Sequence, residues 1–124
     1  MLNRIKWKEM EQLNEVELIG IVGSVSSTLV RDEKSTRFAV ATNYAYRDRG
    51  GMPVIETTWH AVRAFEGDNM RGLEKLSRGD RVRIVGRLRN CRYTDSAGND
   101  RTVTEVYATS LEILDEALLE SQCG

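Results

Sequence analysis

The chain has 124 residues, of which 40% are hydrophobic and 30% are charged, and its formal net charge is −1. This composition fits one globular domain and excludes a disordered chain, and the lack of any apolar run of about eighteen residues excludes a membrane-spanning helix. Two cysteines and one histidine are too few for a zinc site. Because the N-terminus also lacks the apolar core of a signal peptide, we expect a cytoplasmic protein without a cofactor.

The charges are unevenly distributed along the chain. Residues 31–101 contain 15 Lys and Arg against 10 Asp and Glu, a balance of +5, whereas residues 102–124 contain none against 5, a balance of −5. A basic central region indicates a polyanionic partner. A solvated charged surface explains the same counts, and the charge alone slightly favours this second interpretation.

Apolar periodicity predicts five strands and one short helix. The helix, of about two to three turns, is predicted between Asp68 and Gly79, with Met70, Leu73 and Leu76 on one face. Three strands, a helix and two strands form the order of an all-β OB-fold, a five-stranded Greek-key barrel with one helix between strands three and four. The predicted strands span residues 16–25, 36–46, 56–65, 81–93 and 102–114.

The first predicted strand, VELIGIVGSV, is apolar at nearly every position, so both of its faces should be buried. A single small barrel buries only one face of a strand, so we expect a second subunit to cover the other. The chain then divides into an N-terminal extension at 1–13, an OB-fold domain at 14–114 and a short C-terminal segment at 115–124. The residues expected at the subunit contact are Val16, Leu18, Ile19 and Ile21.

The third and fourth predicted strands each carry one face that combines aromatic rings with arginines. In ETTWHAVRAF this face holds Trp59, Arg63 and Phe65, and in RVRIVGRLRNCRY it includes Arg87, Arg89 and Tyr93. Aromatic rings stack on any base, and guanidinium groups follow phosphates, so this face is typical of a surface for unpaired nucleic acid. A salt-bridged sheet surface or a subunit contact remains the alternative, and Arg81 and Arg83 on the same strand face fit a subunit contact.

Six segments, in this order and spacing, strongly resemble the bacterial single-stranded DNA-binding proteins: NEVELIGIVG, FAVAT, YRD, TTWHAVRAF, RGDRVRIVGRLR and YTDSAGNDRTVTEV. The resemblance covers about residues 14–114. It implies an OB-fold protein that protects single-stranded DNA in replication, recombination or repair and has no enzymatic activity. It also implies a homotetramer, or a dimer, with DNA wrapped around it, and a cytoplasmic location on the nucleoid.

The resemblance implies roles at individual positions. Trp59 and Phe65 match the base-stacking aromatics of the family, and His60 matches a position of subunit contact. Tyr46 and Tyr93 stand where relatives usually have tryptophan. Strict alternation would put Tyr46 on the core side, so its assignment depends on the resemblance and on a twist near the hairpin. The matching basic positions are Arg47, Arg49, Arg78, Arg89 and Arg92, and Arg63 and Arg87 join them from the outer strand faces.

The sequence also departs from the family pattern. Ala61 stands where relatives have a basic residue, and Arg63, on the same face, is expected to compensate. Relatives carry a long acidic-tipped tail that docks repair and replication enzymes, whereas this sequence ends at DEALLESQCG, so we do not expect partners recruited through a tail. An enzyme is not expected, because no carboxylate cluster, phosphate loop or nucleophile motif is present. The alternative function is an accessory or primosomal module of the same fold that acts mainly through protein–protein contacts.

Overall fold

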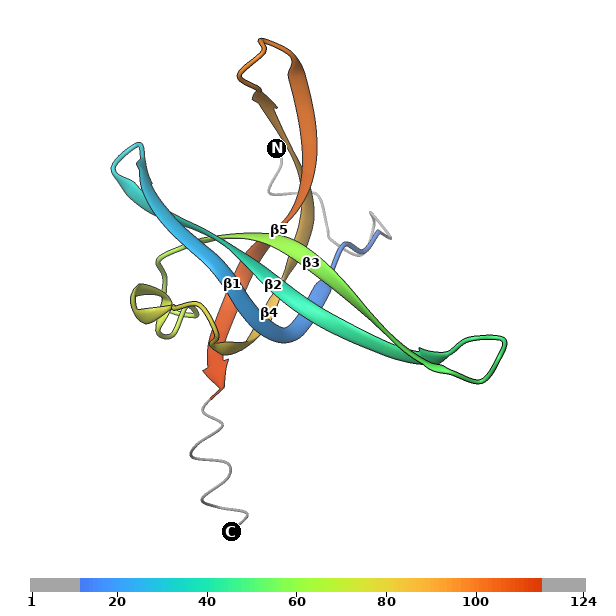
Figure 1. Cartoon of the computed structure of the whole chain (residues 1–124). Coiled ribbons are helices and arrows are strands. Elements are labelled where there is room, and N and C mark those ends of the chain that lie inside the picture. The colour runs from blue at the N-terminus through green and yellow to red at the C-terminus, as the bar shows by residue number, and fades with distance from the viewer. Residues whose placement is uncertain (1–11, 115–124) are drawn as a thin grey trace.

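The computed structural model describes residues 12–114, which form a closed five-stranded barrel with the strand order β1-β2-β3-β5-β4 (Figure 1). The prediction of an all-β OB-fold is confirmed. Within the described residues, no helix is long and apolar enough to cross a bilayer. The strands are β1 (Val16–Val30), β2 (Glu33–Arg47), β3 (Pro53–Phe65), β4 (Arg81–Thr94) and β5 (Asp100–Leu114).

Strand β1 closes the barrel because its two halves pair with different neighbours. Residues 16–21 pair with β4, residues 21–30 pair with β2, and the β2 register shifts between Val22 and Val25. Two glycines permit the close contacts this closure needs. A Cβ at Gly20 would overlap the carbonyl oxygen of Ala41, and one at Gly86 would overlap that of Tyr107.

Alternating side chains of all five strands fill the barrel. Leu18 and Val22 of β1 point inward, whereas Ile19 and Ile21 are 48% and 43% exposed on the outside. Val16 also packs against the core. Of the four residues expected at a subunit contact, only Ile19 and Ile21 therefore present their side chains outward. The remaining fully enclosed apolar residues include Val40, Val62, Ala64, Val82 and Ile84.

Three hairpins extend beyond the barrel (Figure 1). The β1–β2 hairpin turns through Arg31 and Asp32, which both have positive φ, as a tight two-residue turn requires. The turns of the other two hairpins are stabilised by the same pattern of hydrogen bonds to an aspartate. Oδ1 of Asp48 accepts the N–H groups of Gly50 and Met52 in the β2–β3 turn. In the β4–β5 turn, Oδ1 of Asp95 in the same way accepts the N–H groups of Ala97 and Asn99.

The helix predicted between β3 and β4 is confirmed in position but is much shorter than the expected two to three turns: the segment contains one 3₁₀ turn, η2 (Leu73–Lys75). Gly72 has φ 81°, which interrupts a right-handed helix, and the N–H of Leu111 on β5 donates to Asn69, which ties the segment to the barrel. Asp68 therefore caps no helix. Leu73 and Leu76 are nonetheless buried as their spacing predicts.

The predicted terminal segments are outside the described part of the chain. Of the extension at 1–13, only Gln12 and Leu13 are described, and the C-terminal segment 115–124 is wholly outside.

Candidate nucleic-acid interface

Trp59 lies on the outer face of β3, as strand alternation predicts, and is 61% exposed. It pairs with Ala41 on β2, and its six-membered ring reaches across that small residue to Gly23 on β1. A Cβ at Gly23 would come within 2.7 Å of Cζ3 of the indole. Because Gly23 and Ala41 are small, the indole can lie against the sheet while much of it stays accessible.

A second aromatic cluster joins β3, β5 and β4. The rings of Phe65 and Tyr107 have centroids 5.6 Å apart. The guanidinium carbons of Arg87 and Arg89 lie 5.1 Å and 5.3 Å from the centroid of Tyr107, within the range of a cation–π contact. Tyr107 was missed from the sequence, although inward Val106 and Ala108 on either side place it outward by alternation.

Arg63 lies between these aromatic groups, but its charge is paired with a carboxylate of the same chain. Its Nε is 3.1 Å from Oε1 of Glu105, and the two side chains are only 17% and 8% exposed. The N–H does not point at the carboxylate well enough for a hydrogen bond, so the contact is an ion pair. Glu105 therefore neutralises Arg63, which presents less charge to a ligand than the sequence indicates.

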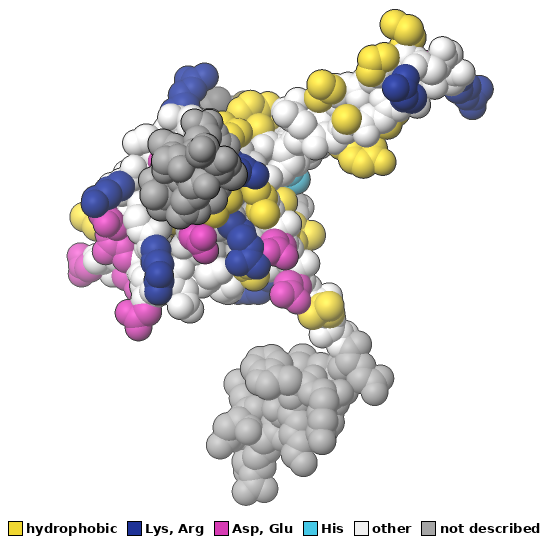
Figure 2. Space-filling view, turned by 90° about the horizontal axis from the view of Figure 1, so that it is seen from below, with side chains coloured by type: hydrophobic (Ala, Val, Ile, Leu, Met, Phe, Trp, Pro, Cys, Tyr) yellow, Lys and Arg dark blue, Asp and Glu magenta, His cyan; other side chains and the backbone are white. Residues whose placement is uncertain are grey.

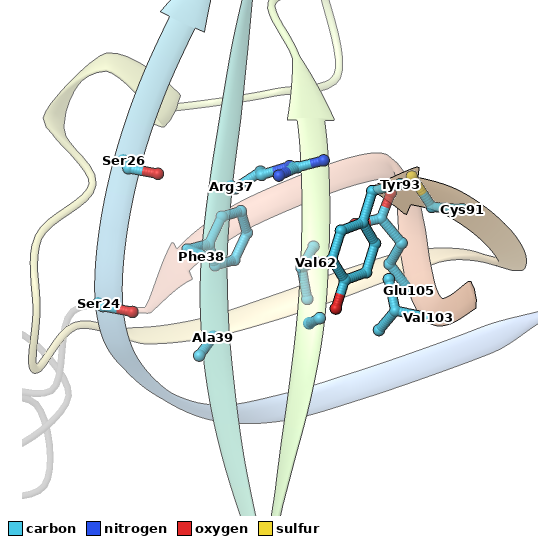
Figure 3. A pocket seen from close by; sticks show the side chains of 11 residues that line it. Ser24, Ser26, Arg37, Phe38, Ala39, Val62, Cys91, Tyr93, Val103 and Glu105 are labelled. Carbon is cyan, nitrogen blue, oxygen red and sulfur yellow. The ribbon is translucent and has the colours of Figure 1, made fainter. Parts of the chain in front are cut away.

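We call the outer face of β3, β5 and β4 that carries Trp59, Phe65 and Tyr107 the outer wall. A groove of about 450 Å³ opens on it, beside Tyr93 (Figure 3). Tyr93 is 51% exposed and supplies an accessible ring at its edge. Arg37 of β2 lines the groove and pairs directly across the sheet with Arg63. Arg37 was also missed, although its neighbour Phe38 faces inward and alternation places Arg37 outward. The other lining residues include Ser24, Ser26, Ala61, Cys91, Val103 and Glu105.

The other predicted arginines lie away from the centre of this wall. Arg47 and Arg49 lie near the tip of the β2–β3 hairpin, where Figure 2 shows basic side chains on the long arm of the molecule. Arg78 is exposed in the loop held to the barrel by the hydrogen bond from the N–H of Gly79 to the carbonyl of Val22. Arg92 is exposed on β4 and alternates with Tyr93, so it faces the other side of its hairpin.

Tyr46 does not share the face of Trp59. The β2–β3 register runs without a shift from Ser35 to Arg47, so Tyr46 stays on the side of Val40 and His60. No irregularity near the hairpin tip changes that alternation. Tyr46 is nevertheless 43% exposed, because the hairpin has left the barrel by this point. Oγ1 of Thr42 lies 2.8 Å from Nε2 of His60, on the same side.

The outer side of β1 forms a different surface, next to β4. Ile19 pairs with Arg83. The guanidinium of Arg83 is bound to Glu17, with Nε donating to Oε2 at 2.6 Å. Exposed apolar side chains beside an internally neutralised arginine fit a protein contact better than a phosphate contact. Within residues 12–114, no three His, Cys, Asp or Glu side chains come together as a metal site.

Known proteins resemble this chain over most of its length. Residues 13–114 match the model of the single-strand binding protein family. Single-stranded DNA-binding protein 1 of Xylella fastidiosa is 31% identical over 93% of this chain and 87% of its own length. The single-stranded DNA-binding protein of Neisseria meningitidis serogroup A is 29% identical, and the match covers 82% of this chain and 60% of that protein, so this chain spans little more than half of that relative.

A solved structure agrees with the sequence comparisons. The Plasmodium falciparum SSB complex with ssDNA superposes with a TM-score of 0.68 at 25% identity, covering 84% of this chain and 96% of that one. The barrel and the sequence match therefore agree, and the chain belongs to the single-strand binding protein family.

Proposed function

We propose that this chain binds single-stranded DNA without regard to sequence, through the outer wall of the barrel. The observation that carries the proposal is that Trp59, the Phe65–Tyr107 cluster and Tyr93 lie exposed or half-exposed on the outer faces of the neighbouring strands β3, β5 and β4. Membership of the family and the DNA-bound Plasmodium relative support it.

Base stacking supplies the affinity and explains the indifference to sequence. Every base has a flat π-face, and each base stacked on an aromatic side chain contributes about 1–3 kcal/mol as judged by alanine replacement. Trp59 offers the largest exposed ring of the wall. In a duplex the base faces are already stacked on one another, so these rings bind unpaired strands in preference.

Arginines at the margins of the wall supply the phosphate contacts. Arg87 and Arg89 are held over the ring of Tyr107, and Arg37 lines the groove beside Tyr93. Each phosphate that a side chain neutralises releases counterions and lowers the slope of log K against log salt by about 0.7 on single strands. Arg47, Arg49 and Arg78 extend this basic margin to the tip of the β2–β3 hairpin and the loop before β4, and Arg92 adds a positive charge on the other side of the β4–β5 hairpin.

The assembled protein is a homo-oligomer, a tetramer or a dimer, in which Ile19, Ile21 and His60 lie at subunit contacts. The exposed isoleucines on β1 support this arrangement, because adjacent apolar side chains gain by burial against a second copy. Such an assembly protects single-stranded DNA in replication, recombination or repair, on the nucleoid in the cytoplasm.

Oligo-dT titration tests the proposed function. The sequence has two tryptophans, and Trp7 is outside the described residues, so Trp7→Phe leaves Trp59 as the sole reporter. We expect oligo-dT to quench its emission, a duplex of equal length to bind far more weakly, and affinity to fall steeply with salt. Equal affinity for duplex, or flat salt dependence, would contradict the proposal. The mass of the free protein, measured by native mass spectrometry, gives the oligomeric state.

A further inference from the structure

The outer half of the β2–β3 hairpin is a ribbon with two open edges. The pairing of β2 with β1 ends at Ala41, and the pairing of β3 with β5 involves only Val62 and Arg63. Among the described residues, 42–47 and 53–58 therefore pair only with each other. Figure 1 shows this hairpin reaching well beyond the barrel. A ligand on one face of the ribbon can pass around its edge to the other face.

Two tyrosines lie together on the face of the ribbon opposite Trp59. Tyr44 is 67% exposed and Tyr46 is 43% exposed, and their ring centroids are 6.0 Å apart with an interplanar angle of 30°. Neither ring contributes to the core. Neighbouring exposed aromatic rings on a projecting hairpin indicate a binding surface.

The charges around the two rings favour a polyanion on the side of the hairpin tip. Arg47 and Arg49 follow directly. Arg47 alternates with Tyr46 and therefore lies on the face of Trp59. Its guanidinium donates to the carbonyl of Gly51 at 2.9 Å, and this contact does not neutralise its charge. The carboxylate of Asp48 is occupied with the N–H groups of the turn. Glu56 pairs across the ribbon with Tyr44 and opposes a phosphate there. A strand that passes from the face of Trp59 around the edge of the ribbon would therefore direct its phosphates toward the arginines near the tip and stack its bases on the two rings.

We propose that Tyr44 extends the base-stacking position that the family resemblance gives to Tyr46 into a platform of two rings, and that single-stranded DNA leaving Trp59 crosses the open edge of the hairpin to reach it. Tyr44 is the new contact, and the proposal rests on the proposed function. Trp59 and Glu56, the partner of Tyr44, are three residues apart on β3, a separation of about 10 Å at the rise of a strand. The path thus bends around the hairpin and does not follow one flat wall.

Tyr44→Ala in the Trp7→Phe background tests this path, with a long oligo-dT as the ligand. Loss of one stacked base should weaken binding about 5- to 150-fold. The quenching of Trp59 at saturation should not change, because the outer wall remains occupied. Tyr44→Phe should bind like the parent. Leu29→Ala is the matched control, since Leu29 is 74% exposed on a different hairpin, β1–β2, and it too should bind like the parent.

Three outcomes would overturn the platform. Affinity of Tyr44→Ala equal to that of the parent and of Leu29→Ala would show that no base stacks on Tyr44. A change in the mass of the assembly without a change in DNA affinity would assign the tyrosine pair to a subunit contact. A parent that binds no oligo-dT would refute the proposed function itself, and this result is distinguished from the other two by the parent titration alone.

Discussion

The close approach of Gly23 to the indole of Trp59 allows a direct test of what positions this ring on the outer wall. In Gly23→Ala, the new Cβ would lie 2.7 Å from Cζ3, 3.2 Å from Cη2 and 3.6 Å from Cε3 of the indole. The first distance is below any normal contact, so the ring or the strand must move. Because Trp59 is 61% exposed, the ring can swing outward at little cost to the fold.

The expected magnitude follows from this geometry. Replacing glycine by alanine within a strand favours folding by about 0.5–1 kcal/mol, which offsets part of the cost of displacing the ring. Stability should therefore change little, and the melting temperature should stay within a few degrees. The DNA affinity should fall, up to the full loss of one stacked base, about 1–3 kcal/mol.

The assay compares Gly23→Ala with Gly67→Ala in the Trp7→Phe background. A Cβ at Gly67 meets no atom within 4 Å, so this control makes the same substitution in open space. We expect the emission of Trp59 to shift to longer wavelength, and oligo-dT affinity to fall, in Gly23→Ala alone. If Gly23→Ala binds as tightly as Gly67→Ala while Trp59→Ala binds weakly, the indole is not positioned by Gly23 and the reasoning fails.

Three further predictions concern charged side chains. Arg89→Gln should reduce the magnitude of the salt slope for oligo-dT by about 0.7, measured by titration at several salt concentrations. Glu105→Gln leaves half-buried Arg63 without its anion, so the free energy of unfolding in urea should fall by roughly 3 kcal/mol. DNA affinity should rise at low salt, because Arg63 is no longer neutralised. An unchanged unfolding free energy and an unchanged DNA affinity would show that the ion pair contributes to neither. The hydrogen bond from Arg101, together with two backbone N–H groups, lowers the pKa of Asp95 from 3.8, so its stabilising contribution is present above that pH and is lost as pH falls through the folded-state value. Wild type should therefore be more stable than Asp95→Asn at neutral pH, and the difference in unfolding free energy should shrink in acid.

The fold was largely predictable because strand alternation is local. Val62 and Ala64 face inward as the pattern of β3 predicts, and Trp59 faces outward for the same reason. The segment between β3 and β4 was not predictable from spacing alone. Leu73 and Leu76 have helical spacing, yet the left-handed Gly72 and the hydrogen bonds to β5 determine the backbone there.

The candidate site was predictable where one strand determines it and was missed where two strands meet. Alternation along β3 already identifies Trp59 and Phe65. The contact of Phe65 with Tyr107 depends on the short parallel pairing of β3 with β5, which no local pattern encodes. The same pairing brings Glu105 to Arg63 across 42 positions of the chain, so the loss of one free positive charge could not be read from either strand alone.

These cross-strand contacts explain why the wall suits an unpaired strand. The indole of Trp59 lies against Gly23, and the ring of Tyr107 is held between Phe65 and two arginines. Side chains that are already ordered lose little conformational entropy when a ligand arrives, so more of each stacking interaction appears as affinity. The conformational entropy lost on binding is then mainly that of the DNA. A single strand is flexible, so it can bend to follow the rings. A duplex has to unstack its bases first, so the proposed mode of binding discriminates by the state of the strand and not by its sequence.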